Sequence, residues 1–259
     1  MFIALDENKN RISIDKVDKT KQYFCPVCDK QLSVKATDSL SVKAHFAHKK
    51  GTECIDTWQH DMSNWHHDWQ CLFPEKYREV VVEKDGVKHR ADILVNGFVI
   101  EFQHSPIKAE EIQERNNFYL NCGYKVIWVF DADNKIKNIE GAEYSIDPFR
   151  ATLEWKRARR EFDIPTPEGV SVFIEYITDI DTLPPQTTRI MLFLTKFDPK
   201  NIHTHNTKPQ YITRGNFLKQ LGFNIENVDS ITDILKRKQY IAYKQRMIPQ
   251  RPYKKHFKF

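Results

Sequence analysis

The sequence lacks long apolar runs and contains only 8 glycines among its 259 residues. No window approaches the roughly 20 apolar residues that a membrane span requires. The opening stretch MFIALDENKNRISID has neither the basic region nor the apolar run of a secretory signal. Low-complexity tracts and internal repeats are also missing, and 40% of the residues are hydrophobic, as in ordinary globular proteins. We therefore expect a cytoplasmic globular protein without a membrane partner.

Acidic residues are missing from one part of the chain. Residues 236–259 contain nine Lys or Arg and no Asp or Glu, whereas the whole chain carries a net charge of only +5. Aromatic residues alternate with these cations, and that combination suits contact with phosphate together with stacking on bases. A solvated basic tail explains the same composition equally well.

Cysteine is scarce, and its five copies form an odd number in a chain without an export signal. A disulfide framework is therefore not expected, which leaves thiol or metal chemistry. Cys25 and Cys28 form a Cys-x2-Cys knuckle, which predicts two thiolates on one zinc ion. Tetrahedral zinc needs two further ligands, and the candidates downstream are His45, His48 and Cys54.

A redox role for the Cys-x2-Cys knuckle is disfavoured because the strand-to-helix context of such motifs is missing. The zinc site can be purely structural, or it can face DNA. The basic side chains near the knuckle that would support contact with DNA are Lys35, Lys43, Lys49 and Lys50. The remaining cysteines, Cys71 and Cys122, are expected to be small buried residues.

The dipeptide Asn96-Gly97 lies between RADILV and FVIEFQ and predicts a two-residue type I′ hairpin. Counting outward from this turn places Asp92 opposite Glu101, and Arg90 opposite Gln103. Because strand side chains alternate with period two, all four project from one face of the hairpin. The sequence therefore predicts a polar corner that contains two carboxylates.

Like charges on directly opposed strand residues destabilise a sheet. A shared proton would relieve the repulsion between Asp92 and Glu101, and so would a divalent cation with hard oxygen ligands. We favour Mg²⁺ or Mn²⁺. The competing interpretation is a simple salt bridge between Arg90 and Asp92 on an exposed sheet face.

A helix is expected directly after the hairpin. Ser105 is a suitable N-cap, Pro106 suits the first helical position, and Gly123 is a plausible stop. Along this helix Glu111, Arg115 and Tyr119 recur every four residues on one stripe. The apolar run at 124–130 reads as a buried strand. A strand, helix and strand in this order imply parallel pairing, so the core is of the α/β class.

The motifs RAD, IEFQ and HSPI, followed by ERNNFY and VIWVFD, resemble the nuclease domain of the competence protein CoiA-like family in the PD-(D/E)xK nuclease superfamily. The resemblance extends over residues 23–131. It implies a restriction-endonuclease-like core, which is a mixed sheet flanked by helices, with an N-terminal zinc ribbon. In similar ribbons the HFAH element precedes a final cysteine, which favours His48 and Cys54 over His45 as zinc ligands.

The resemblance also implies roles for individual residues. Asp92 and Glu101 would be ligands of catalytic Mg²⁺ or Mn²⁺, and Gln103 stands where the catalytic lysine is usual. A glutamine can orient water or phosphate, but it supplies no charge. His66 occupies the position of an acidic residue in the first helix of the superfamily, although packing between tryptophans is the alternative for it. The residues expected to contact substrate phosphate are Arg90, Arg115 and Tyr119; helix packing is an equal alternative for Tyr119.

We expect four regions along the chain. They are N-terminal strands and a zinc ribbon (1–56), a nuclease-like core (57–145), an α/β extension without an assigned role (146–235) and the basic tail (236–259). In the extension, VSVFIEYI and RIMLFLTKF are candidate strands, and TRGNFLKQLGF is a candidate helix.

These patterns together predict a metal-dependent nuclease that hydrolyses phosphodiester bonds in single- or double-stranded DNA. RNA stays open as a substrate. The family resemblance implies a setting in DNA uptake and recombination or in the processing of foreign DNA, with recombination or helicase proteins as partners. The alternative is a non-catalytic, zinc-containing nucleic-acid-binding protein with a degenerate nuclease fold. A purely structural scaffold is a third class, and it predicts no binding of nucleic acid.

Overall fold

The computed structural model describes most of the first two thirds of the chain and parts of the remainder: residues 1–39, 42–58, 63–132, 135–140, 151–162, 166–176, 190–196 and 204–223. The chain forms two compact units, of which the first comprises Met1–Tyr176 and Met191–Gln210. The second comprises Ile177–Ile190 and Tyr211–Phe259. All the candidate site residues belong to the first unit. The basic tail at 236–259 lies outside the described residues.

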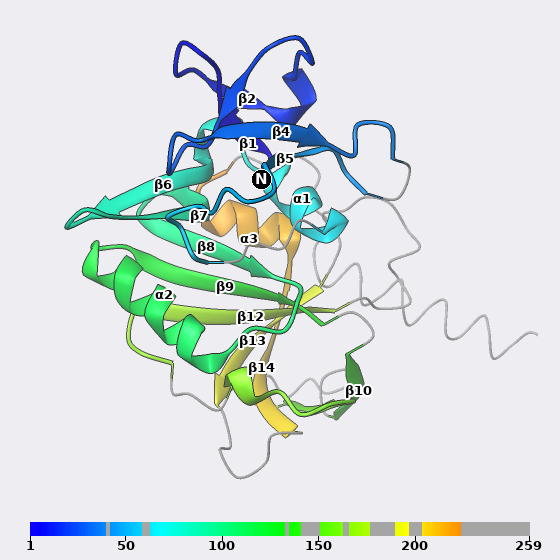
Figure 1. Cartoon of the computed structure of the whole chain (residues 1–259). Coiled ribbons are helices and arrows are strands. Elements are labelled where there is room, and N and C mark those ends of the chain that lie inside the picture. The colour runs from blue at the N-terminus through cyan, green and yellow to red at the C-terminus, as the bar shows by residue number, and fades with distance from the viewer. Residues whose placement is uncertain are drawn as a thin grey trace, which may run out of the picture. The chain divides into compact units, whose positions relative to one another are not determined.

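The N-terminal part of the first unit is a small five-stranded sheet (Figure 1, blue) in the order β2-β1-β3-β4-β5. Its strands are β1 (Ile3–Leu5), β2 (Arg11–Ser13), β3 (Tyr23–Phe24), β4 (Gln31–Lys35) and β5 (His45–His48), with the 3-10 turn η1 (Ile14–Lys16) after β2. The pairs β1–β2, β1–β3, β3–β4 and β4–β5 are antiparallel. Tyr23, Leu32 and Phe46 form part of a buried apolar cluster beneath them. This module has its own small core.

The second sheet has nine strands in the order β10-β11-β14-β13-β12-β9-β8-β7-β6. They are β6 (Arg78–Lys84), β7 (Val87–Val95), β8 (Phe98–Gln103), β9 (Lys125–Asp131), β10 (Ile136–Glu140), β11 (Ala151–Trp155), β12 (Val170–Tyr176), β13 (Ile190–Lys196) and β14 (Thr204–Thr213). The 3-10 turns η2 (Glu75–Tyr77) and η3 (Arg160–Phe162) precede β6 and follow β11. β9 runs parallel to both β8 and β12, whereas β6–β7 and β7–β8 are antiparallel. The sheet is therefore mixed, and the expected parallel crossover is confirmed.

The hairpin forms as the sequence predicts. Asn96 and Gly97 have φ angles of 49° and 81°, the positive values that a type I′ turn requires. Val95 pairs with Phe98, and the ladder of β7 and β8 ends two pairs later, at Ile93 and Ile100. Beyond that point a side chain connects the two strands: Asp92 Oδ2 accepts a hydrogen bond from the Phe102 N–H at 2.9 Å.

The helix after the hairpin exists, but its predicted start is wrong. α2 spans Ala109–Asn121 with Lys108 as N-cap, and the segment before it, including Ser105 and Pro106, is not helical. The carbonyl of Ser105 instead accepts a hydrogen bond from the Gln103 side chain at 2.7 Å. The predicted stop is confirmed, since Gly123 has a φ of 86° just beyond the last helical residues.

Within the described residues, the first unit has two helices, and they lie on opposite faces of the sheet around β8. α1 (Asn64–Gln70) packs on β8 and α2 on β9, as the cyan and green helices of Figure 1 show. Phe102 stacks on Trp69 of α1 with ring centroids 5.0 Å apart, whereas its neighbour Glu101 meets α2. The second unit contains α3 (Arg214–Gln220). None of the helices in the described ranges has both the length and the apolar character that a bilayer span requires.

A buried carboxylate ties α1 to a strand that lies far along the chain. Glu175 of β12 is 1% exposed, and its Oε2 accepts hydrogen bonds from the indole N–H groups of Trp65 and Trp69. In register with it on β9 is Asp131. The sheet that supports the hairpin therefore continues well past residue 145, the expected end of the nuclease-like core.

Candidate active site and metal centre

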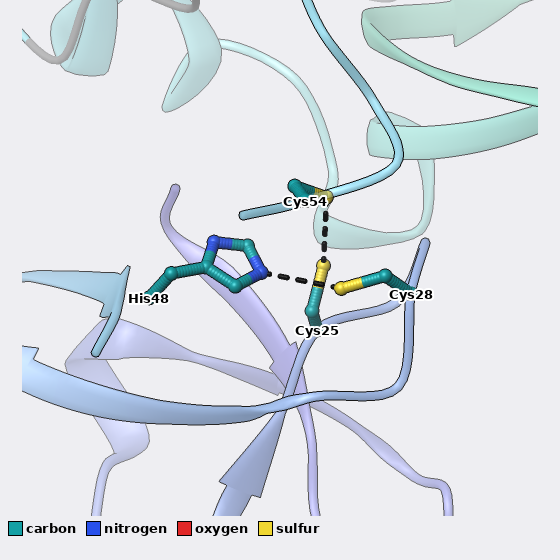
Figure 2. Close-up of side chains that lie close together, drawn as sticks. All are labelled: Cys25, Cys28, His48 and Cys54. Atoms are coloured by element: carbon teal, nitrogen blue, oxygen red, sulfur yellow. Dashed lines mark hydrogen bonds between the residues drawn. The ribbon is translucent and has the colours of Figure 1, made fainter. Parts of the chain in front are cut away.

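Four zinc-type ligands converge in the N-terminal module (Figure 2). The ligand atoms of Cys25, Cys28, His48 and Cys54 all lie within 4.8 Å of one another. Cys25 Sγ is 3.8 Å from Cys54 Sγ, and Cys28 Sγ is 3.3 Å from His48 Nε2. We call this set the Cys3His cluster. Among the described residues it is the only group of three or more His, Cys, Asp or Glu side chains close enough to share a metal ion.

Strand alternation explains why His48 joins the cluster and His45 does not. The two residues are three apart on β5, so they face opposite sides of the strand. His45 Nδ1 lies 3.0 Å from the carbonyl oxygen of Lys43. The structure therefore brings His48, and not His45, to the three cysteines.

Burial and mutual repulsion shape the chemistry of the cluster. Burial raises the pKa of the Cys25 thiol to about 12, and burial also raises the pKa of Cys54. Thiolates packed this closely need a cation to offset their charge. Three sulfur ligands and one imidazole in this arrangement can bind zinc.

The remaining two cysteines are not the buried residues that the sequence suggested. Cys71 is exposed and Cys122 is half-buried. Cys71 follows α1 directly, and its Sγ lies 3.5 Å from His67 Nε2. The expectation of burial is wrong because both residues lie at the C-terminal ends of helices, where the chain meets solvent.

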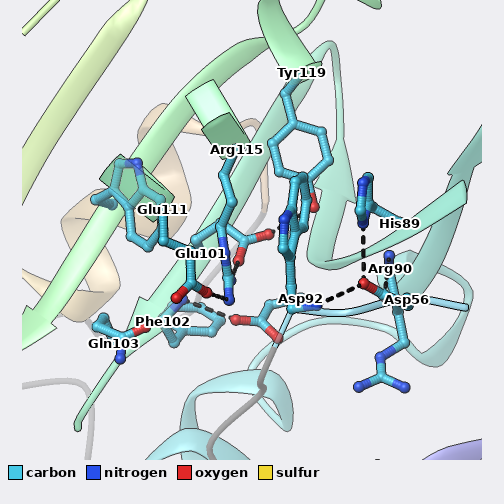
Figure 3. Close-up of polar contacts among 12 residues, drawn as sticks. Asp56, His89, Arg90, Asp92, Glu101, Phe102, Gln103, Glu111, Arg115 and Tyr119 are labelled. Atoms are coloured by element: carbon cyan, nitrogen blue, oxygen red, sulfur yellow. Dashed lines mark hydrogen bonds and ion pairs between the residues drawn. The ribbon is translucent and has the colours of Figure 1, made fainter. Parts of the chain in front are cut away.

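The two carboxylates of the hairpin, Asp92 and Glu101, are 2% and 1% exposed, and we call them the acid pair. Asp92 Oδ1 lies 2.9 Å from His66 Nε2, while its Oδ2 accepts the Phe102 N–H. Figure 3 shows the environment of both carboxylates. His66 is thus brought to the acid pair by the structure. The interpretation of Asp92 as part of an exposed surface salt bridge is wrong, because the residue is buried.

Glu101 meets the polar stripe of α2. Its Oε2 pairs with Arg115 at 2.8 Å, and its Oε1 accepts a hydrogen bond from the Tyr119 hydroxyl at 3.0 Å. Arg115 also pairs with Glu111, one turn earlier on the helix, at 2.5 Å. Burial is the largest single effect and lowers the pKa of Arg115, but the charge of Glu101 and the hydrogen bond and charge of Glu111 together outweigh it and raise the pKa overall. The predicted stripe therefore forms and faces the acid pair.

The charges of both Asp92 and Glu101 raise the pKa of the Tyr119 hydroxyl. Its side chain is fully buried, and its pKa lies well above the usual value because of burial first and the charge of Glu101 next, with Asp92 adding to the effect. The phenol is therefore a neutral hydrogen-bond donor at physiological pH. Both members of the acid pair act on this one hydroxyl group.

Gln103 and Arg90 are both buried, but they face different surroundings. Gln103 is 8% exposed, and its amide donates to the Ser105 carbonyl. Arg90 is 6% exposed, and its Nη1 contacts the sulfur of Met1 at 3.5 Å. Its pKa is raised, against the effect of burial, chiefly by the charges of Glu79 and Asp56. Arg90 therefore lies where the N-terminal module meets β7.

Sequence reasoning missed the buried residues at this junction. Glu79 accepts the backbone N–H groups of Phe2 and Ile3 at 2.8 and 2.9 Å. Asp56 lies 2.9 Å from His89 and accepts the Arg90 N–H at 3.1 Å. The one signal for Asp56 in the sequence is its place two residues after Cys54.

A histidine and aspartate pair beside Gln103 was also missed. His104 Nδ1 lies 2.5 Å from Asp131 Oδ2. The side chain of His104 is 41% exposed, whereas that of Asp131 is 6% exposed. His104 directly follows β8, and Asp131 is the last residue of β9, the parallel neighbour of β8. No motif in the sequence marks the pair.

Comparison with known families gives two matches. Residues 72–180 match the model described as competence protein CoiA, nuclease-like domain, and residues 6–55 match the one described as competence protein CoiA, N-terminal domain. The acid pair falls in the first range, and the Cys3His cluster falls in the second. The two ranges together cover more than half of the chain. No curated protein and no solved structure matches the chain significantly.

Proposed function

Because the chain belongs to the competence protein CoiA family, we propose that it is a metal-dependent nuclease that hydrolyses phosphodiester bonds in DNA. The observation that carries the proposal is the burial of two carboxylates, Asp92 and Glu101, on adjacent strands of a nuclease-like domain. Burying two like charges costs free energy, so we expect a pair of carboxylates that is kept in the core to serve a function. The mixed sheet with a helix on each face supports a restriction-endonuclease-like core.

The acid pair offers oxygen donors that suit Mg²⁺ or Mn²⁺. An ionised carboxylate has about four lone-pair sites, so Asp92 and Glu101 can keep their present hydrogen bonds and still contribute a ligand atom. A bound divalent ion lowers the pKa of water and neutralises charge on the phosphate. The residues present therefore fit a catalytic metal.

The side chains around the acid pair would orient the carboxylates, orient water or phosphate, and stabilise the charge of the phosphate. His66 holds Asp92, and Tyr119 holds Glu101, each by a hydrogen bond. Gln103 is neutral, so it orients water or phosphate without supplying charge. Of the two arginines, Arg115 contacts the acid pair directly, whereas Arg90 faces Met1 and Glu79. We therefore assign the stabilisation of phosphate charge to Arg115.

The N-terminal module would hold structural zinc in the Cys3His cluster and would contribute to DNA binding. Lys43, Lys49 and Lys50 are exposed around the cluster, and exposed lysines bind phosphate by releasing counterions. The composition of the basic tail at 236–259, with nine Lys or Arg, also suits binding to nucleic acid. A role in DNA uptake and recombination, or in the processing of foreign DNA, follows from the family, with recombination or helicase proteins as partners.

A second candidate function is a non-catalytic nucleic-acid-binding protein that retains zinc. The favouring observation is that the chain already offsets the charge of Glu101 with its own Arg115. The usual catalytic lysine is also replaced by Gln103. A binding module needs the lysines and the zinc, but it does not need a metal at the acid pair.

One experiment separates these functions. The zinc-loaded protein is incubated with single-stranded DNA, double-stranded DNA and RNA, with Mg²⁺ or Mn²⁺, and both cleavage and binding are measured. Asp92→Asn and Glu101→Gln should abolish cleavage and preserve binding. Asp85→Asn, an exposed carboxylate in the turn between β6 and β7, is the matched control and should cleave normally. Binding without cleavage by the wild-type protein would establish the second candidate.

A further inference from the structure

The short segment that leaves the Cys3His cluster contacts β7, the strand that carries Asp92. Two residues after Cys54, the Asp56 side chain is 4% exposed. Its Oδ1 lies 2.9 Å from His89 Nδ1, and its Oδ2 accepts the Arg90 N–H. Both partners belong to β7, and Arg90 is two residues from Asp92. Figure 3 shows Asp56 bonded to this strand.

Trp58 continues the connection toward Glu101. Its ring stacks on His89 with centroids 3.4 Å apart and planes 6° apart. The guanidinium of Arg115, the ion-pair partner of Glu101, lies 5.1 Å from the centre of the Trp58 ring. Trp58 also makes an edge contact with Tyr119 at 5.6 Å. Both groups that hold Glu101 therefore pack against this one indole.

We propose that Asp56 and Trp58 are positioning residues that couple the Cys3His cluster to the acid pair, so that zinc in the cluster sets the geometry of Asp92 and Glu101. Asp56 acts through β7 on Asp92, and Trp58 acts through Arg115 and Tyr119 on Glu101. The inference rests on the proposed function, because it concerns the divalent metal that the acid pair would bind.

The physical reason lies in the length and burial of the segment. With Cys54 held on zinc, only one residue separates it from Asp56, so the backbone has little freedom to withdraw the carboxylate from β7. Without the ion, Cys54 is released, and the buried contacts of Asp56 must hold the segment alone. A ligand that orders one site lowers the cost of ordering the other.

Coupling between two metal sites must be reciprocal. If zinc strengthens the binding of Mn²⁺ at the acid pair, Mn²⁺ must strengthen the binding of zinc by the same factor. A residue that only stabilises the fold need not show this reciprocity. The pair of affinities is therefore the measurement that distinguishes positioning from general support.

The test uses the zinc-loaded full chain and direct titration with Mn²⁺, with Asp92→Asn to identify binding at the acid pair. Asp56→Asn should retain one zinc per chain but weaken Mn²⁺ binding about tenfold, within the range of ordinary couplings. In equilibrium competition with a zinc chelator, Mn²⁺ should raise the affinity of the wild-type protein for zinc and have no such effect in Asp56→Asn. Trp58→Phe, which keeps an aromatic ring, should show a smaller weakening.

Glu53→Gln is the matched control, because this exposed carboxylate precedes Cys54 and loses the same charge. It should leave both affinities unchanged. Hydrogen exchange of the Phe102 amide, which donates to Asp92, gives a readout without Mn²⁺. That amide should exchange faster in Asp56→Asn and after zinc removal from the wild-type protein. An unchanged Phe102 amide would show that Asp56 acts only locally.

The possible outcomes separate the two proposals. If the wild-type protein shows no Mn²⁺ binding that is lost in Asp92→Asn, the proposal of a metal-dependent nuclease is overturned. The proposed coupling is then overturned as well. If the wild-type protein binds Mn²⁺ and Asp56→Asn binds it equally well, the coupling alone is overturned. A loss of Mn²⁺ binding in Glu53→Gln as large as that in Asp56→Asn would also overturn the coupling, since charge alone would explain it.

Discussion

His66 Nε2 lies 2.9 Å from Asp92 Oδ1, and both side chains are almost completely buried. The histidine thus reaches from α1 to β7 and fixes one oxygen of the acid pair. A hydrogen bond to a charged group contributes about 1.5–3 kcal/mol. His66 therefore orients a proposed metal ligand without being required as a ligand itself.

Replacing His66 tests this arrangement. We expect His66→Ala to lower kcat/KM for DNA cleavage by roughly 10- to 100-fold, because Asp92 loses its orientation and about 1.4 kcal/mol corresponds to each factor of ten. His67→Gln changes the next residue of the same helix, whose ring faces Phe2 at 4.5 Å, and should retain activity. Steady-state cleavage assays of both variants check the prediction, and equal losses would contradict it.

The ion pair between Arg115 and Glu101 should control stability as well as activity. Removal of one partner from a buried pair costs about 3–5 kcal/mol, because the other charge is left uncompensated. We expect Arg115→Met to reduce the free energy of unfolding by that amount. The double variant Arg115→Met with Glu101→Gln should recover part of it. Urea unfolding of the single and double variants measures the difference, and additive losses would show that the pair does not interact.

Removal of zinc should destabilise the N-terminal module. Metal ligation adds its binding free energy to folding, and the raised thiol pKa of Cys25 means that protons compete with the ion. Zinc affinity should therefore fall as the pH is lowered. Metal analysis and thermal unfolding at several pH values check this expectation. Cys28→Ser should lose zinc, whereas Cys71→Ser, outside the cluster, should keep one ion per chain.

His67 should give stability a separate dependence on pH. The hydrogen bond that His67 donates to the Asp68 carboxylate, and then its contact with Cys71, raise the pKa of His67 to about 9, against an ordinary value of 6.5. The folded chain therefore binds this proton more tightly than the unfolded chain does. The resulting stabilisation is fully present below pH 6.5 and is lost as the pH rises through about 9. The difference in unfolding free energy between the wild-type protein and His67→Gln should shrink accordingly.

Local signals in the sequence predicted the parts of the site that local chemistry determines. Asn96-Gly97 specifies its turn through positive φ angles, and the pairing of β7 with β8 follows from that turn as far as Ile93 and Ile100. The spacing of Cys25 and Cys28 is likewise a property of one tight turn. These features need few neighbours, so the sequence alone was enough.

Tertiary contacts decided what the sequence did not predict. Ser105 and Pro106 are typical residues for a helix start, yet α2 begins only at Ala109. The Ser105 carbonyl instead accepts a hydrogen bond from the Gln103 side chain. Asp56 and Glu79 are ordinary acidic residues in the sequence, and their importance arises from strands distant along the chain. The direction of Arg90 depends in the same way on the N-terminal module.

The hydrogen bonds from Trp65 and Trp69 to Glu175 determine which fragments of this protein should fold when they are expressed alone. A fragment that stops at residue 145 would lack the acceptor for two buried indole groups, and β9 would become an unprotected edge. Such a piece should be insoluble when expressed alone, even though it contains the whole acid pair. Any shortened version intended for crystallisation should therefore extend at least through β12.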